Sequence, residues 1–485
     1  MRVKTAKREM EIEQLLKRVT GIADNSENVR EGFAFFALSG SQNDGLDYIE
    51  HAIKNGAKFV ILDQNATLPK KYDGAVEFIK VDNPRSYISL ASSIFYKEKP
   101  QYIVAVTGTN GKTSVANFFQ QICDLTGYKS ASIGTLGVIT SEQQYEAKDQ
   151  PSLTSPCAIE LHEILHNLSN SSYTHASIEA SSHGLRQHRL DHVNFQAAGF
   201  TNLTQDHLDY HGTMEEYFAA KLRLFDEVLK PGSYAVLNAD TNEFQRMKDI
   251  CNSRSIKVLD YGKKAKELQI VSSSGVLEVQ VFGQKYKLQP TVKGEFQLYN
   301  ILCSTGLAAA CELPVNKILD ALNDLKAAKG RLELVAKHNG ADVYVDYAHT
   351  PDSLQTILTT LRQICKGELH VLFGCGGNRD ATKRPIMGEI ASRCADHIII
   401  TDDNPRKEHS DAIRKEIMAA CNNGVEIEGR ANAIEYAMSH LKENDILVIA
   451  GKGHENYQLI GNSQTYFSDF DEVLKISTRG SSKLA

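Results

Sequence analysis

Short apolar runs alternate with amphipathic segments along most of the chain. Two apolar runs in the first hundred residues, Phe33–Leu38 and Lys58–Asp63, are bounded by glycine or polar residues, which is typical of strands. From residue 102 onward, helical patterns separate strand-like runs at Tyr102–Val106, Ala176–Glu179, Ala197–Thr201 and Tyr234–Leu237. This alternation predicts a parallel α/β sheet.

The pattern changes twice after this central region. Between Ile256 and Val292, polar and apolar residues alternate around glycine turns, which predicts a small antiparallel excursion. A helical stretch, Leu298–Cys311, follows, and Ala327–Gly330 reads as a linker. Beyond it, helical patterns separate strand-like runs at Val343–Asp346, His370–Phe373, His397–Thr401 and Ile446–Ala450. We therefore expect three α/β domains, residues 1–100, 101–330 and 331–485, with ligands in the clefts between them.

Composition narrows the function classes. The 485 residues are 42% hydrophobic and 24% charged, with a net charge of −6, which excludes a strongly basic nucleic-acid binder and disfavours an anionic membrane as partner. No apolar run approaches the roughly 18 residues that cross a bilayer, and glutamates follow the basic start where a signal peptide is apolar. We expect a cytoplasmic protein. Nine scattered cysteines without a CxxC pair indicate neither a zinc ribbon nor a disulfide framework.

The most specific motif is a glycine-rich turn between a strand and a helix. The apolar run that ends at Thr107 leads into Gly108, Thr109, Asn110, Gly111, Lys112, Thr113 and Ser114, and then into the helical pattern Val115–Leu125. This arrangement wraps polyphosphate in backbone N–H groups, with Lys112 directed to the β/γ-phosphates and the Thr113 hydroxyl to Mg²⁺. Thr107 stands where the strict form of this loop has its first glycine. The alternative is an ordinary glycine turn, but the context predicts ATP binding.

Two further polar groups follow successive strands of the central segment. Glu179 ends one apolar run, and His207 lies shortly after the next. Such strand ends carry functional side chains in α/β proteins, although each residue alone is more often a plain strand-end polar group. Glu179 with Thr113 suits Mg²⁺, which prefers oxygen ligands, whereas His207 is a less typical ligand for it.

Lys221 lies in an amphipathic helical pattern, Met214–Leu229, with apolar residues on both sides of it. One interpretation is a lysine whose stem packs while its ammonium reaches water. The other is a partly desolvated lysine with a depressed pKa. A neutral amine of this kind can react with carbon dioxide to form a carbamate, which is a Mg²⁺-binding anion. The residues alone leave both interpretations open.

A set of motifs in colinear order resembles the Mur ligases of peptidoglycan synthesis. The motifs are Thr107–Thr113, Glu179–Arg189, Asn202–His207, Tyr217–Phe225, Gly374–Gly388, Asp403–Arg406 and Gly451–Gln458. The resemblance covers essentially the whole chain. It implies an N-terminal α/β domain for a uridine nucleotide, a central P-loop parallel-sheet ATPase domain and a C-terminal Rossmann-like domain that brings the amino acid.

The resemblance also implies roles for individual residues. Contacts to the UDP-MurNAc-peptide are expected from Ser26, Ser41, Gln42, Asn43, Thr154, Ser155, Ser181, Gln187 and Arg189. Further ATP contacts are expected from Asn300, Arg331 and Asp346, with His349 nearby, and diaminopimelate contacts from Arg379, Asp403, Asn404, Pro405, Arg406, Gly451 and Glu455. Lys221 is the lysine that becomes carbamylated, and it shares Mg²⁺ with Thr113, Glu179 and His207. Lys112, Glu179, His207 and Lys221 form the implied catalytic set. Asn25 and Glu27, on either side of Ser26, replace an Asp and an Arg of the family pattern.

The implied activity is an ATP-dependent ligation, with ATP as co-substrate and Mg²⁺ as cofactor, by a monomeric enzyme. It joins meso-diaminopimelate to UDP-N-acetylmuramoyl-L-alanyl-D-glutamate through an acyl phosphate. Arg406 suits bidentate binding of the distal carboxylate that distinguishes diaminopimelate from lysine. The alternatives are a lysine-adding relative, a folylpolyglutamate synthetase-like ligase and a nucleotide-binding module without chemistry.

Overall fold

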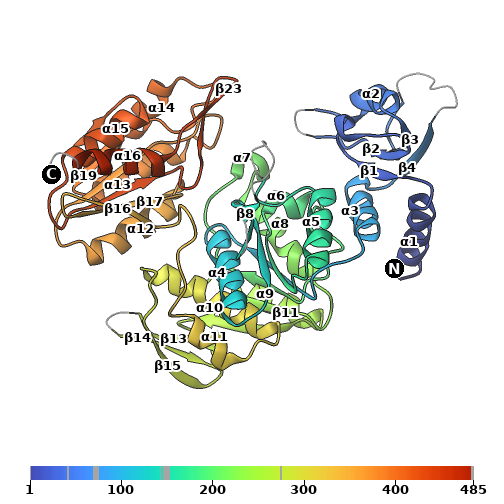
Figure 1. The fold of residues 1–485 in the computed structure, drawn as a ribbon, viewed down its shortest axis with the longest axis horizontal. Helices are drawn as coiled ribbons and strands as arrows, with labels where there is room; N and C mark the ends of the chain where they lie inside the picture. The colour runs from blue at the N-terminus through green and yellow to red at the C-terminus, as the bar shows by residue number, and fades with distance from the viewer. Residues whose placement is uncertain are drawn as a thin grey trace.

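The computed structural model describes residues 2–40, 43–68, 76–141, 144–145, 153–273 and 276–481. Three main sheets follow one another along these residues, each flanked by helices, and the N-terminal and C-terminal bodies lie to either side above the central one in the view of Figure 1. The predicted α/β class with three bodies is confirmed. The domain limits expected near residues 100 and 330 fall in the connections between the sheets.

The N-terminal body has a four-stranded parallel sheet in the order β1-β2-β3-β4. Its strands are β1 (Gly21–Ala23), β2 (Phe33–Phe36), β3 (Ala57–Asp63) and β4 (Glu77–Val81). Its helices are α1 (Arg2–Leu16), α2 (Ile49–Lys54) and α3 (Pro84–Phe95), with short turns η1 (Ser26–Asn28) and η2 (Gly45–Tyr48). Both strands predicted here are confirmed.

The central body has an eleven-stranded sheet in the order β15-β14-β13-β12-β11-β10-β5-β9-β6-β7-β8. Its strands are β5 (Tyr102–Thr107), β6 (Ser130–Gly134), β7 (Gly137–Thr140), β8 (Gln144–Tyr145), β9 (His175–Glu179), β10 (Ala197–Phe200), β11 (Tyr234–Asn238), β12 (Lys257–Gly262), β13 (Leu268–Ser272), β14 (Leu277–Val281) and β15 (Gln284–Leu288). Its helices are α4 (Lys112–Leu125), α5 (Ala158–Asn170), α6 (Ser182–Arg186), α7 (Leu208–His211), α8 (Met214–Arg223), α9 (Phe244–Ser253), α10 (Glu295–Ala310) and α11 (Val315–Ala321).

Two expectations for the central body need correction. β12 pairs parallel to β11, and β13 pairs parallel to β12, so the first part of residues 256–292 extends the parallel sheet. Only β13, β14 and β15 form the antiparallel excursion. The helix expected to run to Leu229 changes to a π-helical turn, η3 (Leu224–Val228), after Arg223. Strand pairing and helical pitch depend on tertiary packing, which local alternation does not record.

The C-terminal body has a six-stranded sheet in the order β16-β17-β21-β18-β19-β20, in which only β16 is antiparallel. Its strands are β16 (Glu333–His338), β17 (Ala341–Asp346), β18 (Leu369–Phe373), β19 (His397–Ile400), β20 (Gly424–Glu426) and β21 (Ile446–Ala450), and a separate hairpin joins β22 (Tyr457–Ile460) to β23 (Ser463–Tyr466). Its helices are α12 (Pro351–Ile364), α13 (Lys383–Cys394), α14 (Ser410–Met418), α15 (Arg430–Ser439) and α16 (Asp469–Ser481).

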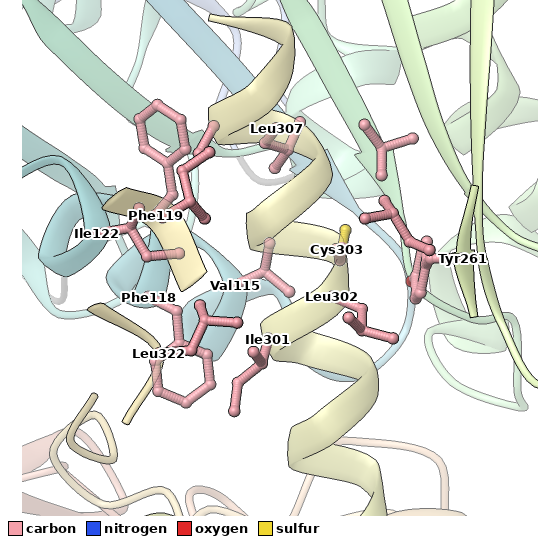
Figure 2. Close-up of a cluster of buried hydrophobic side chains, with 14 of the residues drawn as sticks. Val115, Phe118, Phe119, Ile122, Tyr261, Ile301, Leu302, Cys303, Leu307 and Leu322 are labelled. Carbon is pink, nitrogen blue, oxygen red and sulfur yellow. The ribbon is translucent and has the colours of Figure 1, made fainter. Parts of the chain in front are cut away.

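The largest core packs one face of the central sheet against α4 and α10. Figure 2 shows side chains of α4 on one side of α10 and Tyr261 of β12 on the other. Helix α10 is buried around most of its surface, because apolar or small residues occupy nearly every position after its first turn. The core therefore fixes the N-terminus of α4, and with it the glycine-rich turn, against the carboxyl ends of the strands.

His162 of α5 gives the fold a dependence on pH. The side chain is fully buried, and burial, with a smaller contribution from Lys99, lowers its pKa from 6.5 to about 3. His162 therefore binds a proton below pH 6.5 in the unfolded chain but only near pH 3 in the native state. Because the unfolded state binds more protons between these values, stability falls as the pH falls through this window. Between pH 6.5 and pH 4.5, His162 should lower the unfolding free energy of the wild type by about 2–3 kcal/mol. In His162→Leu this part of the loss should be absent. Urea titrations at both pH values measure it; the exposed His440→Leu control keeps the loss, and an unchanged loss in His162→Leu contradicts the assignment.

None of the helices in the described ranges combines the length and apolar character that crossing a bilayer requires.

Candidate functional site

The glycine-rich turn lies between β5 and α4, as the sequence predicts. Gly108 and Gly111 have φ of +148° and +88°, conformations that side chains disfavour. A Cβ on Gly108 would lie 1.9 Å from Thr201 Oγ1, and one on Gly111 would lie 2.5 Å from Asn300 Oδ1. Glycine is therefore required at both positions, and the turn leads directly into the N-terminus of α4, where backbone N–H groups can bind an anion.

The segment after β10 shapes this turn. Thr109 N–H donates to the Asn202 carbonyl and Asn110 N–H donates to Asn202 Oδ1, both at 2.9 Å. Thr204 N–H donates in turn to Thr109 Oγ1 at 3.0 Å. The sequence analysis placed Asn202 and Thr204 in the motif that follows the strand at Ala197–Thr201 but gave neither of them a role.

Thr113 and Glu179 meet beside the turn. The Thr113 hydroxyl donates to Glu179 Oε2 at 3.0 Å, and the buried carboxylate also accepts from Thr135 N–H at 2.9 Å. A hydroxyl and a carboxylate oxygen at this separation are the type of ligand set that Mg²⁺ uses, completed by waters and phosphate oxygens. The two residues predicted from separate motifs thus form one oxygen-rich position.

Two lysine side chains converge on one carbonyl oxygen. Lys112 Nζ donates to the Gly108 carbonyl at 3.0 Å and to that of Thr109 at 2.8 Å, while Lys221 Nζ donates to the same Gly108 carbonyl at 2.7 Å. Lys221 is 1% exposed, and its Nζ lies 4.3 Å from the centroid of the Tyr217 ring. Burial, followed by the charge of Lys112, holds the pKa of Lys221 well below its usual value. The interpretation of Lys221 as a solvent-reaching lysine is therefore wrong.

His207 also lies near Tyr217, the ring that contacts Lys221. Its ring centroid is 6.1 Å from that of Tyr217 and 4.9 Å from that of His183, and its Nε2 lies 3.4 Å from Asp206 Oδ2. Desolvation lowers its pKa to about 3 despite Asp206, so the ring is neutral at physiological pH. Among the described contacts of His207, none joins it to Glu179, so its place in a shared metal site stays a prediction.

A cavity of about 640 Å³ opens between the turn and the C-terminal body. It has the size of a small-molecule site, and its lining brings together residues predicted from both bodies: Asn110, Gly111, Ser114, Asn300, Arg331, Asp346 and His349. Aromatic rings that the sequence did not single out, Phe296 and Tyr299, line another part of it. Aromatic rings near a phosphate-binding turn suit the stacking of a nucleotide base.

Arg331 links the two bodies at this cavity. Its guanidinium donates to Thr113 Oγ1 at 2.9 Å and stacks 4.4 Å from the centroid of the Tyr347 ring. Within the described part of the chain, its Nε is buried without a hydrogen-bond partner. Burial raises the pKa of the neighbouring Asp346 to about 6, although Arg331 opposes that shift. A cation with a spare donor beside the turn is suited to an additional anion.

The residues expected to contact the muramoyl peptide lie close to one another and next to Glu179. The Ser155 hydroxyl donates to the Glu179 carbonyl at 2.7 Å and lies 3.0 Å from Ser181 Oγ. Arg189 donates to the Ser155 carbonyl at 2.8 Å and to Gln187 Oε1 at 2.7 Å. Thr154 Oγ1 lies 3.2 Å from the hydroxyl of Thr135, which also contacts Glu179.

The uridine residues are only partly described. Ser26 is buried, and its hydroxyl lies 2.9 Å from His51 Nδ1. Asn43 is exposed, and its carbonyl accepts from Gly40 N–H at 2.8 Å, whereas Ser41 and Gln42 lie outside the described residues. Asp24, which sequence reasoning missed, interacts electrostatically with Arg189 across the two bodies.

The residues expected at the amino acid gather at the carboxyl ends of β18, β19 and β21. Asn404 Nδ2 donates to Glu455 Oε2 at 2.9 Å, and a Cβ on Gly451 would lie 2.8 Å from Asp403 Oδ2. Lys452, fully buried and missed by the sequence analysis, lies 3.2 Å from Glu455 Oε2. Burial and the neighbouring Asp403 raise the pKa of Glu455.

Arg406 and Arg379 belong to two adjoining loops. Arg406 follows Pro405, has a φ of +53° and donates to the Gly377 carbonyl at 3.1 Å, so it joins the loop after β19 to the loop after β18. Arg379 is exposed in that second loop. Its neighbour Asp380 accepts from Gln205 Nε2 of the central body at 3.4 Å, which places this loop at the interface between the bodies.

Three family models match the chain in the order of its bodies. They are the Mur ligase family catalytic domain over residues 18–97, the Mur ligase middle domain over 106–308 and the Mur ligase glutamate ligase domain over 330–453. The chain belongs to the Mur ligase family. The predicted family is thereby confirmed, and so is the three-body architecture that it implies.

Several named relatives of this Mur ligase carry the same name. It is 44% identical over 94% of both chains to the UDP-N-acetylmuramoyl-L-alanyl-D-glutamate–2,6-diaminopimelate ligase of Mesorhizobium japonicum. It is 43% identical to the ligase of the same name from Brucella melitensis, over 94% of this chain and 93% of that one. A solved structure of a ligase with this name superposes with a TM-score of 0.66 at 30% identity, over 96% of each chain. A MurF ligase from Thermotoga maritima in complex with ADP shares the fold at 18% identity, with a TM-score of 0.65 over 97% of this chain and 99% of that one.

Proposed function

We propose that this Mur ligase is an ATP-dependent enzyme that joins meso-diaminopimelate to the D-glutamate carboxylate of UDP-N-acetylmuramoyl-L-alanyl-D-glutamate. The observation that carries the proposal is the sequence identity of 43–44%, over 94% of this chain, to ligases named for this reaction. The arrangement of Lys112, Thr113 and Glu179 beside a cavity of nucleotide size supports it. We also propose a cytoplasmic location, for which the nine cysteines, all of them free, are the support.

The proposed reaction has two steps. A carboxylate oxygen of the D-glutamate attacks the γ-phosphorus of ATP, which releases ADP and leaves an acyl phosphate. The amine of diaminopimelate then attacks the acyl carbon, loses a proton, and the tetrahedral intermediate collapses to an amide and inorganic phosphate. Activation is needed because a free carboxylate is a poor electrophile. The work of the protein is to position the reactants and to neutralise charge.

Each group of residues has a part in this scheme. Lys112 and the backbone N–H groups at the N-terminus of α4 are proposed to hold the phosphates, and Arg331 contributes a spare donor from the C-terminal body. Thr113 and Glu179 are proposed to hold Mg²⁺, which supplies a Lewis acid that offsets the charge of the phosphates. Ser155, Ser181, Gln187 and Arg189 lie close enough to Glu179 to orient a carboxylate beside that position.

Carbamylation of Lys221 has a physical rationale in this site. Two ammonium groups that donate to the same carbonyl oxygen repel each other in a buried environment. The depressed pKa of Lys221 favours its neutral amine, which is the form that reacts with carbon dioxide. A carbamate at this position would pair with Lys112 and would add an oxygen ligand near the phosphates. We therefore propose that Lys221 is carbamylated in the active enzyme.

A phosphate-release assay separates this proposal from a binding module without chemistry. With ATP alone, we expect phosphate release close to background. With ATP and the UDP-MurNAc-dipeptide it stays low, and adding diaminopimelate raises it at least tenfold, because the amine completes the turnover. Release that does not depend on the dipeptide contradicts the ligase proposal.

Arg406 is proposed to pair with the distal carboxylate of diaminopimelate. Arg406→Ala should lower kcat/KM for diaminopimelate by about 2–5 kcal/mol in transition-state terms, the range for breaking a buried charge pair. Activity with lysine, which has no distal carboxylate, should fall far less. The exposed neighbour Lys407→Ala is the matched control and should change neither value. If both amino acids lose activity by the same factor in Arg406→Ala, Arg406 acts only through its hydrogen bond to the adjoining loop.

A further inference from the structure

The amino ends of three neighbouring strands in the C-terminal sheet carry a second cluster of polar side chains. His370 of β18 and His397 of β19 are direct partners in the parallel pairing, and their rings stack with centroids 4.3 Å apart. Glu368 immediately precedes β18, and Asp445 immediately precedes β21. One potential ligand atom from each of Glu368, His370 and His397 lies within 4.8 Å of the other two.

The hydrogen bonding of this cluster is incomplete. The His370 side chain is 3% exposed, and its buried Nε2 makes no hydrogen bond within the described ranges. The nearby Asp445 Oδ2 is 3.5 Å away and already accepts from Lys442 N–H at 2.8 Å. His397 Nε2 lies 3.1 Å from Glu368 Oε2, and both of these side chains are about half exposed.

This cluster is separate from the proposed active site. The loops that carry Asp403, Arg406 and Gly451 follow the carboxyl ends of β19 and β21, whereas the cluster lies at the opposite edge of the same sheet. The five residues of β18 separate the two edges by roughly 15 Å at about 3.3 Å per residue. The chemistry of the ligation therefore has no use for these side chains.

We propose that Glu368, His370 and His397 bind a first-row transition-metal ion, with Zn²⁺ as the expected occupant. Two imidazoles and one carboxylate are a set that Zn²⁺ accepts, whereas Mg²⁺ prefers oxygen ligands alone. Asp445 accepts from Glu368 N–H at 2.8 Å, so it fixes the backbone that presents the carboxylate. The ring of His370 is buried, whereas the side chains of Glu368 and His397 are about half exposed and have room to adjust around a bound ion. The ion would join the starts of β18 and β19.

The test is a Zn²⁺ titration of the full-length protein in the presence of millimolar Mg²⁺, which keeps the oxygen-rich site beside Thr113 occupied. A chromophoric chelator reports competition, and thermal unfolding reports stabilisation. We expect one equivalent of Zn²⁺ to bind and to raise Tm. His397→Gln should weaken that binding at least tenfold and abolish the rise in Tm, while ligase activity stays at the wild-type level. The exposed His440→Gln is the matched control and should behave like the wild type.

Co²⁺ supplies a second readout that does not depend on stability. Its visible absorption depends on the ligands that surround it, so a mixed nitrogen and oxygen site should give a band that saturates at one equivalent. Glu368→Gln and His397→Gln should each remove that band, and both positions are exposed enough for the variants to fold. Wild-type protein that binds no Zn²⁺ under these conditions, or a His397→Gln variant that binds it with unchanged affinity, overturns the proposal.

Discussion

Lys221→Ala is expected to reduce turnover to near the background of the assay, while nucleotide binding persists. The reason is that alanine removes both the buried amine beside Gly108 and the anion that carbamylation would create there. Small carboxylates such as formate or acetate should restore part of the activity, because they can enter the space that the side chain leaves and act as oxygen ligands. Initial rates measured with increasing concentrations of these acids give the size of the rescue.

Two controls sharpen this prediction. The exposed Lys230→Ala should keep full activity and should not respond to added acid. Lys221→Met, which fills the site with a side chain of similar length, should remain inactive without acid and should show little rescue, because the space is blocked. Isotope-labelled bicarbonate should give a carbamate resonance in the wild type that is absent from both Lys221 variants. Full activity of Lys221→Ala without added acid contradicts the carbamate hypothesis.

Lys112→Ala is expected to lower kcat by at least about 100-fold, the scale seen when one preorganised charge contact to a reacting group is lost. Lys112 donates to two carbonyl groups of its own turn, so its ammonium is held where phosphate oxygens would arrive. Burial lowers its pKa, and the nearby Glu179 partly opposes that shift. The side chain contributes charge more than packing, so the fold should persist.

Circular dichroism and Tm measurements establish whether Lys112→Ala is folded, and single-turnover measurements isolate the phosphoryl-transfer step. The exposed Lys257→Ala serves as the control in the same body and should match the wild type. If folded Lys112→Ala retains more than a tenth of wild-type turnover, Lys112 does not carry the proposed charge contact.

Motifs that are contiguous in the chain could be predicted from the sequence. The turn at residues 108–114 combines a strand, fixed glycine positions and a helix start within a few residues, so its geometry follows from local chemistry. Lys221 required both its apolar neighbours and the family resemblance, because a packed and a solvent-reaching lysine have the same local pattern. The structure decides between them through the 1% exposure of Lys221.

Other features depend on contacts between distant segments and left no local signal. Lys452 follows a strand like many other residues, and its burial beside Glu455 becomes evident only when β21 lies between β17 and β18 in the sheet. The parallel pairing of β12 likewise depends on β11, which precedes it by a whole helix. The contribution of Arg331 to the turn requires the docking of two bodies. The periodic pattern of apolar residues therefore predicts none of these three contacts.

The most direct test of the central claim is an amino-acid panel read by product mass. The protein is incubated with ATP, Mg²⁺, UDP-MurNAc-L-alanyl-D-glutamate and an equimolar mixture of meso-diaminopimelate, L-lysine, L-ornithine and L-glutamate, and the products are separated by mass. We expect a single dominant product, the dipeptide extended by diaminopimelate, formed with equal amounts of ADP and phosphate. A dominant lysine or glutamate adduct, or the absence of any adduct while ATP is consumed, would contradict the assignment.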